Sequence, residues 1–92
     1  MLYFVEFSNR VHKDLDKIPS YIRSKFYVWL KTIDEIGLER TRIISGFHDE
    51  PLKGKRLGQR SVRLNRAYRA IYVLKESKIK VIHILEVTKH DY

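Results

Sequence analysis

The chain has 92 residues, the length of one domain, and its 43% hydrophobic and 33% charged residues are typical of a soluble globular protein. The absence of cysteine excludes a disulfide framework, a thiolate zinc site and a cysteine nucleophile, and fits a reducing cytoplasm. Its 19 basic and 11 acidic residues give a formal net charge of +8, which favours a polyanionic partner such as nucleic acid. We therefore expect a single domain over residues 1–92.

The N-terminal third predicts a strand and a short helix. The aromatic and β-branched residues of YFVEF predict a strand over residues 3–7 and not a signal peptide. Val11, Leu15 and Ile18 recur at helical spacing, and Pro19 ends the helix that they predict.

A second helix is predicted between Pro19, which can occupy its first turn, and Gly37, which follows it as a stop signal. Its apolar stripe consists of Ile22, Phe26, Trp29, Leu30, Ile33 and Ile36. Two helices joined at a proline predict an αα-hairpin packed on a sheet. No segment approaches the ~20 consecutive apolar residues of a membrane span, so we expect no membrane association.

The C-terminal half predicts a sheet. Residues 38–59 are polar and contain several glycines, so we expect mainly loop there. Strands are predicted at 60–64, 67–74 and 78–87, with a tight turn at Asn65-Arg66 and the last strand central. The expected fold is α+β, with a short N-terminal strand, a two-helix hairpin and a three-stranded antiparallel meander, the helices lying on one face.

Most of the excess positive charge comes from one segment. Residues 53–69 hold seven of the 19 basic residues and none of the 11 acidic ones, so the rest of the chain is nearly neutral. The seven residues are Lys53, Lys55, Arg56, Arg60, Arg63, Arg66 and Arg69.

Strand alternation suggests how this charge is arranged in space. Because neighbouring side chains point to opposite faces, Arg69 is expected on the face without helices, beside Arg63 and the cations of the preceding loop. The charge cluster would then form a basic groove. Alternatively, Arg69 forms an ion pair with Glu86 or Glu6 across the sheet, a common arrangement for a charge within a strand.

A carboxylate, a histidine and arginines around a phosphate are sufficient for RNA cleavage without a metal. Glu50 precedes the basic segment, and His90 follows the last predicted strand. The alternatives are that Glu50 is a solvated or salt-bridged carboxylate, that His90 is a surface residue, and that Tyr92 is simply the chain terminus. The residues alone favour RNA binding over RNA cleavage.

The remaining candidate residues predict little chemistry. His83, inside an apolar strand, is expected to be structural, and His12 and His48 are expected on the surface. No histidine pair has metal-ligand spacing, so no metal site is expected. Gly54 and Gly58 match no nucleotide-binding loop, and no cofactor is expected.

Three stretches resemble the RelE/ParE superfamily, the toxins of bacterial type II toxin–antitoxin systems. They are FVEFSNRVHKDLDKIP, PLKGKRLGQRSVRLNRAYRAIY and ILEVTKHDY, which cover most of the chain in the same order. The fold that the resemblance implies, a strand, two helices and an antiparallel sheet, agrees with the layout above. Many members are ribosome-dependent mRNA interferases that need no metal, and the YoeB-like and HigB-like toxins are the most similar group.

The resemblance also implies roles for particular residues. Glu50 in EPLK matches the proposed general base, and Arg69 in YRAIY matches the arginine that stabilises the transition state. His90 matches the proposed general acid, and Tyr92 a terminal tyrosine that orients or stacks on the substrate. Asp91 separates the two here, whereas they are adjacent in YoeB-like toxins, so either is the candidate acid. The implied RNA-binding residues are Lys53, Lys55, Arg56, Arg60, Arg63 and Arg66.

The implied partners are a cognate antitoxin encoded as a separate chain, mRNA on the ribosome, and ribosomal RNA. The expected location is the cytoplasm. An alternative within the superfamily is a ParE-like inhibitor of DNA gyrase without RNase activity, because members share the fold without sharing the function. A plain RNA-binding module without catalysis is a third hypothesis.

Overall fold

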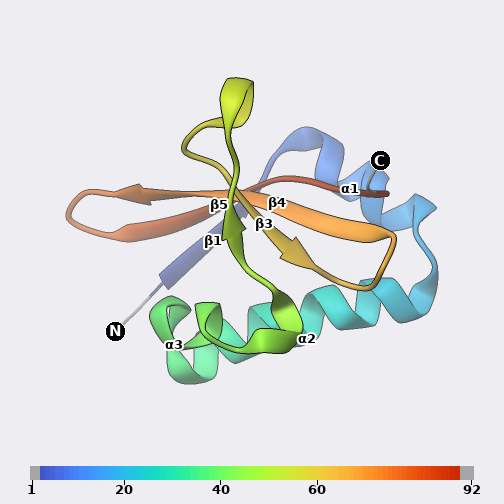
Figure 1. Cartoon of the computed structure of the whole chain (residues 1–92), viewed down its shortest axis with the longest axis horizontal. Coiled ribbons are helices and arrows are strands. Elements are labelled where there is room, and N and C mark those ends of the chain that lie inside the picture. Colours follow the sequence, from blue (N-terminus) through green and yellow to red (C-terminus); the bar gives the residue numbers. More distant parts are fainter. Residues whose placement is uncertain (1–2, 90–92) are drawn as a thin grey trace.

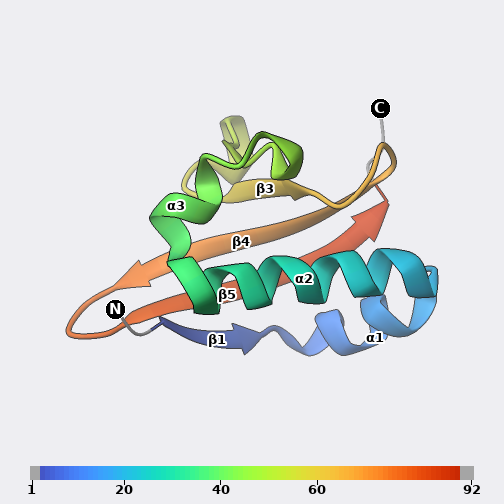
Figure 2. The same cartoon turned by 90° about the horizontal axis from the view of Figure 1, so that it is seen from below.

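In the computed structural model, which describes residues 3–89, the chain forms a five-stranded mixed sheet packed against helices (Figures 1 and 2). The α+β class predicted from the sequence is therefore confirmed. The described elements, with η for a 3-10 helix, are β1 (Tyr3–Phe7), α1 (Asn9–Lys17), α2 (Ser20–Ile36), α3 (Leu38–Arg42), η1 (Ser45–Phe47), β2 (Glu50–Pro51), η2 (Gly54–Arg56), β3 (Arg60–Arg63), β4 (Tyr68–Glu76) and β5 (Lys80–Lys89).

The strands run in the order β1-β5-β4-β3-β2. The antiparallel meander of β3, β4 and β5 is present as predicted, and β5 lies in the interior of the sheet. The sheet is larger than predicted, however, because β1 pairs parallel with β5 and β2 adds a two-residue edge strand. A strand of two residues is too short to show the alternation of apolar and polar side chains by which strands are predicted. For this reason β2 falls within the segment predicted as loop.

One face of the sheet is covered by α2, and α3 lies on the same side (Figure 1). The Trp29 ring of α2 packs 5.3 Å from the Tyr72 ring of β4, and both side chains are completely buried. Burial of an aromatic ring of this size stabilises the fold by about 2–3 kcal/mol. The sheet contributes its alternate residues to this core: Val62, Ala70, Tyr72, Ile82, Ile84 and Val87.

The position of α1 differs from the predicted hairpin on one face. β1 pairs with only the first half of β5, and α1 follows it along the same edge (Figure 2). There Asp14 Oδ2 accepts the Val87 backbone N–H at 3.1 Å, and Ser8 Oγ donates to the Leu85 carbonyl at 2.7 Å. Asp14 of α1, together with Ser8 just before the helix, therefore satisfies edge groups of β5 that lack a neighbouring strand.

The short helix α3 is also missed by the sequence reading, which assigns its residues to a loop. Leu38 and Thr41 are buried at its inner side, and Gly37 joins it to α2 with φ of +85°, a conformation that favours glycine. A five-residue helix repeats its apolar positions too few times to be recognised from spacing. No helix in the described part of the chain is long and apolar enough to cross a membrane.

A β-bulge in β5 reverses which residues reach each face. Where β4 advances by one residue β5 advances by two, so Leu85 has no partner in β4. Ile84 lies in the core before the bulge and Val87 lies in the core after it. Glu86 and Thr88 therefore point to the face opposite α2, where regular alternation would place Val87.

Glu39 of α3 joins the helix to two strands. It accepts hydrogen bonds from Tyr3 Oη and, at 3.1 Å, from Lys80 Nζ. The hydrogen bond from Tyr3, a backbone hydrogen bond and the one from Lys80 lower the pKa of Glu39 to about 2. Because the folded-state pKa is depressed, the carboxylate stabilises the fold above its unfolded pKa of about 4.5, and this contribution is lost as the pH falls towards 2.

We predict that Glu39→Gln lowers the Tm by a few degrees at pH 7, a modest effect because the group is exposed. The difference from the unsubstituted chain should shrink below pH 4.5 and vanish near pH 2, as followed by circular dichroism melting. A difference that is the same at all pH values would show that charge on Glu39 has no part in stability.

Candidate active site

A pocket of about 490 Å³ lies on the face of the sheet opposite α2. We call it the open-face groove. The ionisable residues that line it are Arg10, Glu50, Arg56, Arg69, Glu86 and Lys89. Three of them, Glu50, Arg56 and Arg69, belong to the site predicted from the sequence, so the structure brings these three together.

Arg69 is the most buried cation of the groove, with 7% of its surface exposed. Its Nη1 donates to two backbone carbonyls, those of Asn65 at 2.8 Å and Tyr68 at 3.1 Å. Within residues 3–89 it forms no ion pair, so the alternative of a partner in Glu86 or Glu6 is not what the structure shows. A guanidinium is always protonated, and this one is held by dipoles only. It therefore retains its charge for an anion in the groove.

The turn before β4 explains how Arg69 is held. Asn65 Oδ1 accepts the backbone N–H groups of Ala67 and Tyr68 at 2.8 and 2.9 Å, which closes an Asx turn. The carbonyl of Asn65 thereby faces the guanidinium of Arg69. The predicted tight turn at Asn65-Arg66 thus joins β3 to β4 and also holds the side chain of Arg69 in place.

Glu50 enters the groove from β2, where it pairs with Ser61 of β3. Its side chain is about half exposed, and its Oε2 lies 3.3 Å from His48 Nε2. The backbone of His48 has φ of +45°, the left-handed conformation, at the end of η1. His48 lies on the surface, as predicted, but the sequence analysis does not identify its contact with Glu50. The contact could have been predicted from the sequence because His48 lies only two residues before Glu50.

Asp49 fixes the segment that carries Glu50. Its buried carboxylate, only 1% exposed, accepts hydrogen bonds from Arg60 Nε and Tyr72 Oη, each at 2.5 Å. Burial and the contact with Asp49 raise the pKa of Tyr72, so its hydroxyl remains a donor. Because adjacent residues of an extended segment point to opposite sides, anchoring Asp49 beneath the sheet turns Glu50 towards the groove. Sequence analysis does not identify this role of Asp49.

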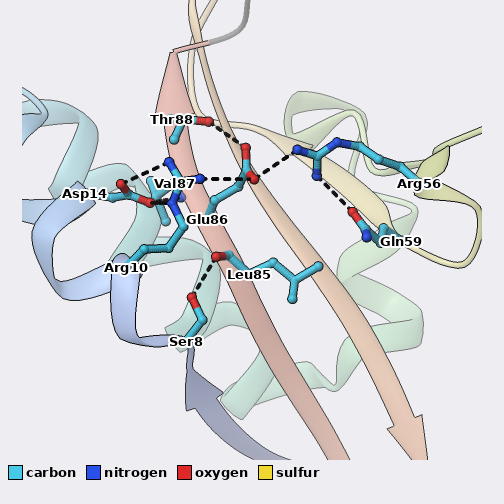
Figure 3. Close-up of polar contacts among 9 residues, drawn as sticks. All are labelled: Ser8, Arg10, Asp14, Arg56, Gln59, Leu85, Glu86, Val87 and Thr88. Carbon is cyan, nitrogen blue, oxygen red and sulfur yellow. Dashed lines mark hydrogen bonds and ion pairs between the residues drawn. The ribbon is translucent and has the colours of Figure 1, made fainter.

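Glu86 lies at the centre of a polar network on β5 (Figure 3). Its Oε2 lies 3.0 Å from Arg56 Nη2 and 3.6 Å from Arg10 Nη1, and its Oε1 accepts the Thr88 hydroxyl at 3.0 Å. Arg10, from α1, and Glu86 are two groove residues that sequence reasoning does not assign to the site. Long-range packing of α1 on β5 and the bulge of β5 bring them there.

The other predicted residues lie outside the lining. Arg60 points to the helix-covered side, where it contacts Asp49, because it alternates with Ser61. Arg63 is exposed beside Arg69 in the β3–β4 pairing, and Arg66 is exposed in the connection between these strands. Lys53 and Lys55 are exposed in the segment between β2 and β3 that projects from the sheet (Figure 1). His90 and Tyr92 lie outside the described residues.

The groove therefore contains a half-exposed carboxylate, Glu50, and the guanidinium of Arg69, which has no acidic partner among residues 3–89. A phosphodiester placed between them would meet an acceptor for a proton and a donor for a phosphate oxygen. Among residues 3–89 no group of three or more His, Cys, Asp or Glu side chains is arranged to hold a metal ion.

We predict that Asp49→Asn lowers the free energy of unfolding by about 2–3 kcal/mol, because Arg60 then loses its buried anionic partner. Urea denaturation measures this loss. Asp34→Asn, which removes an equal charge from the exposed side of α2, is the control and should change stability little. Equal losses in the two variants would indicate that the buried contacts of Asp49 contribute nothing specific.

The sequence matches no protein-family model and no curated protein. Solved structures similar to this one include a YoeB/ParE toxin from Agrobacterium tumefaciens, with a TM-score of 0.76, 18% identity and coverage of 96% of this chain and 99% of that one. YafQ from E. coli has a TM-score of 0.67, 20% identity and coverage of 97% and 94%. A chain of the YoeB-YefM complex from Staphylococcus aureus matches with a TM-score of 0.70 and 23% identity, and the match covers 100% of this chain and 100% of that one. This likeness confirms the RelE/ParE-type toxin fold implied by the sequence.

Proposed function

We propose that this chain is the toxin of a toxin–antitoxin pair and acts as a metal-independent endoribonuclease on ribosome-bound mRNA. The observation that carries the proposal is the presence in one groove of Glu50 and of the Arg69 guanidinium, which forms no ion pair with any described residue. The fold shared with YoeB- and YafQ-type toxins supports it.

The proposed reaction is an internal transfer within the RNA. Glu50 removes the proton of a 2′-hydroxyl, whose oxygen then bonds to the adjacent phosphorus as the bond from phosphorus to the 5′-oxygen breaks. Arg69 stabilises the negative charge that accumulates on the phosphate oxygens. The leaving 5′-oxygen takes a proton from an acid, the role that we assign to His90 or Tyr92. The products are a 2′,3′-cyclic phosphate and a 5′-hydroxyl, and only RNA has the required 2′-hydroxyl.

Of the two carboxylates in the groove, Glu50 is the better candidate for the base. Glu86 accepts a hydrogen bond from Thr88 and lies against two guanidiniums, so its oxygens are already engaged by other groups. Within residues 3–89, the one side-chain contact of Glu50 is with His48, and about half of the Glu50 side chain is exposed. We propose that His48 orients this carboxylate towards the substrate.

The exposed cations around the groove support binding to polyanions larger than one nucleotide. Lys53, Lys55 and Arg63 are exposed and have no ion pair within residues 3–89. We assign them, with Arg56 and Arg66, to phosphates of mRNA and ribosomal RNA. A small groove supplies few contacts to orient an RNA strand, so an enzyme of this size gains from a ribosome that holds the message in place.

The proposed partner is a separate antitoxin chain, as in the YoeB-YefM complex from Staphylococcus aureus. An acidic segment that folds on the groove would cover its cations and block the entry of RNA. The proposed location is the cytoplasm, where mRNA is translated.

We predict that Arg69→Ala and Glu50→Gln each slow mRNA cleavage by about 100-fold or more, because they remove charge stabilisation and the base. Cleavage is measured by primer extension on message bound to purified ribosomes, in the presence of EDTA. Arg40→Ala, which removes an exposed cation from α3, is the control and should cleave normally. Circular dichroism melting verifies that each variant is folded. Full cleavage by the double variant would contradict the assigned site.

A separate measurement addresses inhibition of DNA gyrase, the alternative function. We expect the purified chain to leave gyrase supercoiling unchanged while cleaving ribosome-bound message. Inhibition of supercoiling by a protein that leaves the message intact would replace the RNase proposal with the gyrase one. Binding to RNA without either effect would indicate a plain RNA-binding module.

A further inference from the structure

Two arginines from distant parts of the chain converge on one carboxylate in the open-face groove. Arg10 comes from α1 and Arg56 from η2, and their Nη atoms lie 3.6 and 3.0 Å from the same Oε2 of Glu86 (Figure 3). Glu86 is largely buried, whereas about half of each arginine side chain is exposed. A carboxylate oxygen thus occupies an anion position between two guanidiniums.

Each arginine has a second contact that does not involve Glu86. Arg10 donates to both carboxylate oxygens of Asp14 one helical turn away, at 3.2 and 3.4 Å. Arg56 Nη1 donates to Gln59 Oε1 at 2.9 Å. These contacts retain the two guanidiniums at the groove when another anion takes the place of the Glu86 carboxylate. A phosphate is suited to that place, because a guanidinium binds carboxylate and phosphate oxygens with the same fork of donors.

The strand positions of Glu86 and Arg69 are diagonal neighbours on the open face of the sheet. Across the sheet Thr88 pairs with Arg69, and Glu86 lies two residues before Thr88 on the same face of β5. The Cα atoms of such diagonal neighbours lie about 7–8 Å apart. This is comparable with the separation of neighbouring phosphates in one nucleic-acid strand. A strand with one phosphate at Arg69 can therefore present the next phosphate to Arg10 and Arg56.

We propose that Arg10 and Arg56 form a second phosphate-binding position in the groove, which Glu86 occupies until nucleic acid displaces it. The proposal rests on the proposed function for the identity of the ligand, single-stranded RNA. Glu86 is then an internal competitor that lowers the affinity of the groove for phosphate. Its negative charge also repels an approaching strand, so RNA held by the ribosome enters more readily than free RNA.

The test uses the full chain and a short fluorescein-labelled single-stranded RNA, with binding followed by anisotropy over a series of salt concentrations. Glu86→Gln should bind about five-fold more tightly at low salt, because one negative charge beside the phosphate is removed. The slope of log affinity against log salt should steepen by about 0.7, the release of one more counterion. Glu76→Gln, which removes an equal charge at the far end of β4, is the matched control and should change neither quantity appreciably.

The gain must depend on the two arginines. In chains that carry Arg10→Gln together with Arg56→Gln, adding Glu86→Gln should tighten binding by much less than five-fold, because only the general repulsion by Glu86 is then removed. Arg10→Gln alone should weaken binding about three-fold, whereas Lys13→Gln on the exposed side of α1 should have a smaller effect. The Arg10 measurement remains informative if Glu86→Gln does not fold. Three results would overturn the proposal. They are unchanged or weaker binding by folded Glu86→Gln, a gain of the same size in chains without both arginines, and equal effects of the Arg10 and Lys13 changes.

A DNA oligonucleotide of the same sequence separates this proposal from the proposed function. DNA offers the same phosphates but no 2′-hydroxyl, so tighter binding by Glu86→Gln is expected for both nucleic acids. If both bind as expected while ribosome-bound message stays intact, the phosphate position stands and the RNase function fails. If message is cleaved and Glu86→Gln binds neither nucleic acid more tightly, the phosphate position fails and the RNase function stands.

Discussion

The register of β4 is the constraint on which both the core and the groove depend. Tyr72 packs against Trp29 on the helix-covered face, and Arg69, three residues earlier, lies on the opposite face. A slip of one residue would turn Tyr72 out of the core and place Arg69 on the helix-covered face, at a cost comparable with the stability of a small domain. β3 and β5 hold β4 from both sides. The same packing that folds the chain therefore positions its most buried cation.

The partners of each cation, and not the number of cations, determine the electrostatics of the groove. Arg60 is neutralised beneath the sheet by Asp49, and Arg56 lies against Glu86. Arg69 is held only by carbonyl dipoles within the described residues. Of the seven basic residues concentrated between positions 53 and 69, one thus supplies the strongest uncompensated charge inside the pocket. The exposed members of the cluster add a more general attraction for polyanions.

Local patterns account for much of the fold, because strand alternation and helical spacing are properties of neighbouring residues. They predict β4 with Arg69 on the face opposite α2, and the apolar stripe of α2. They do not predict α1 at the sheet edge, the orientation of Glu86 or the buried contact of Asp49. Each of these depends on a partner far away in the sequence, on strand pairing or on a bulge, and a single sequence does not encode such contacts as a local repeat.

The bulge at Leu85 has a consequence for comparing this chain with others of its fold. The extra residue shifts the inward and outward positions of β5 by one from Glu86 onwards. In a protein whose last strand is regular, an ungapped alignment therefore sets core residues opposite groove residues over this final stretch. At the identities of 18–23% reported above, comparison of the amino acids alone does not reveal such a shift. Near the C-terminus, equivalent positions in two such proteins are therefore those whose side chains lie on the same face of the sheet. They need not be the positions that an ungapped alignment pairs.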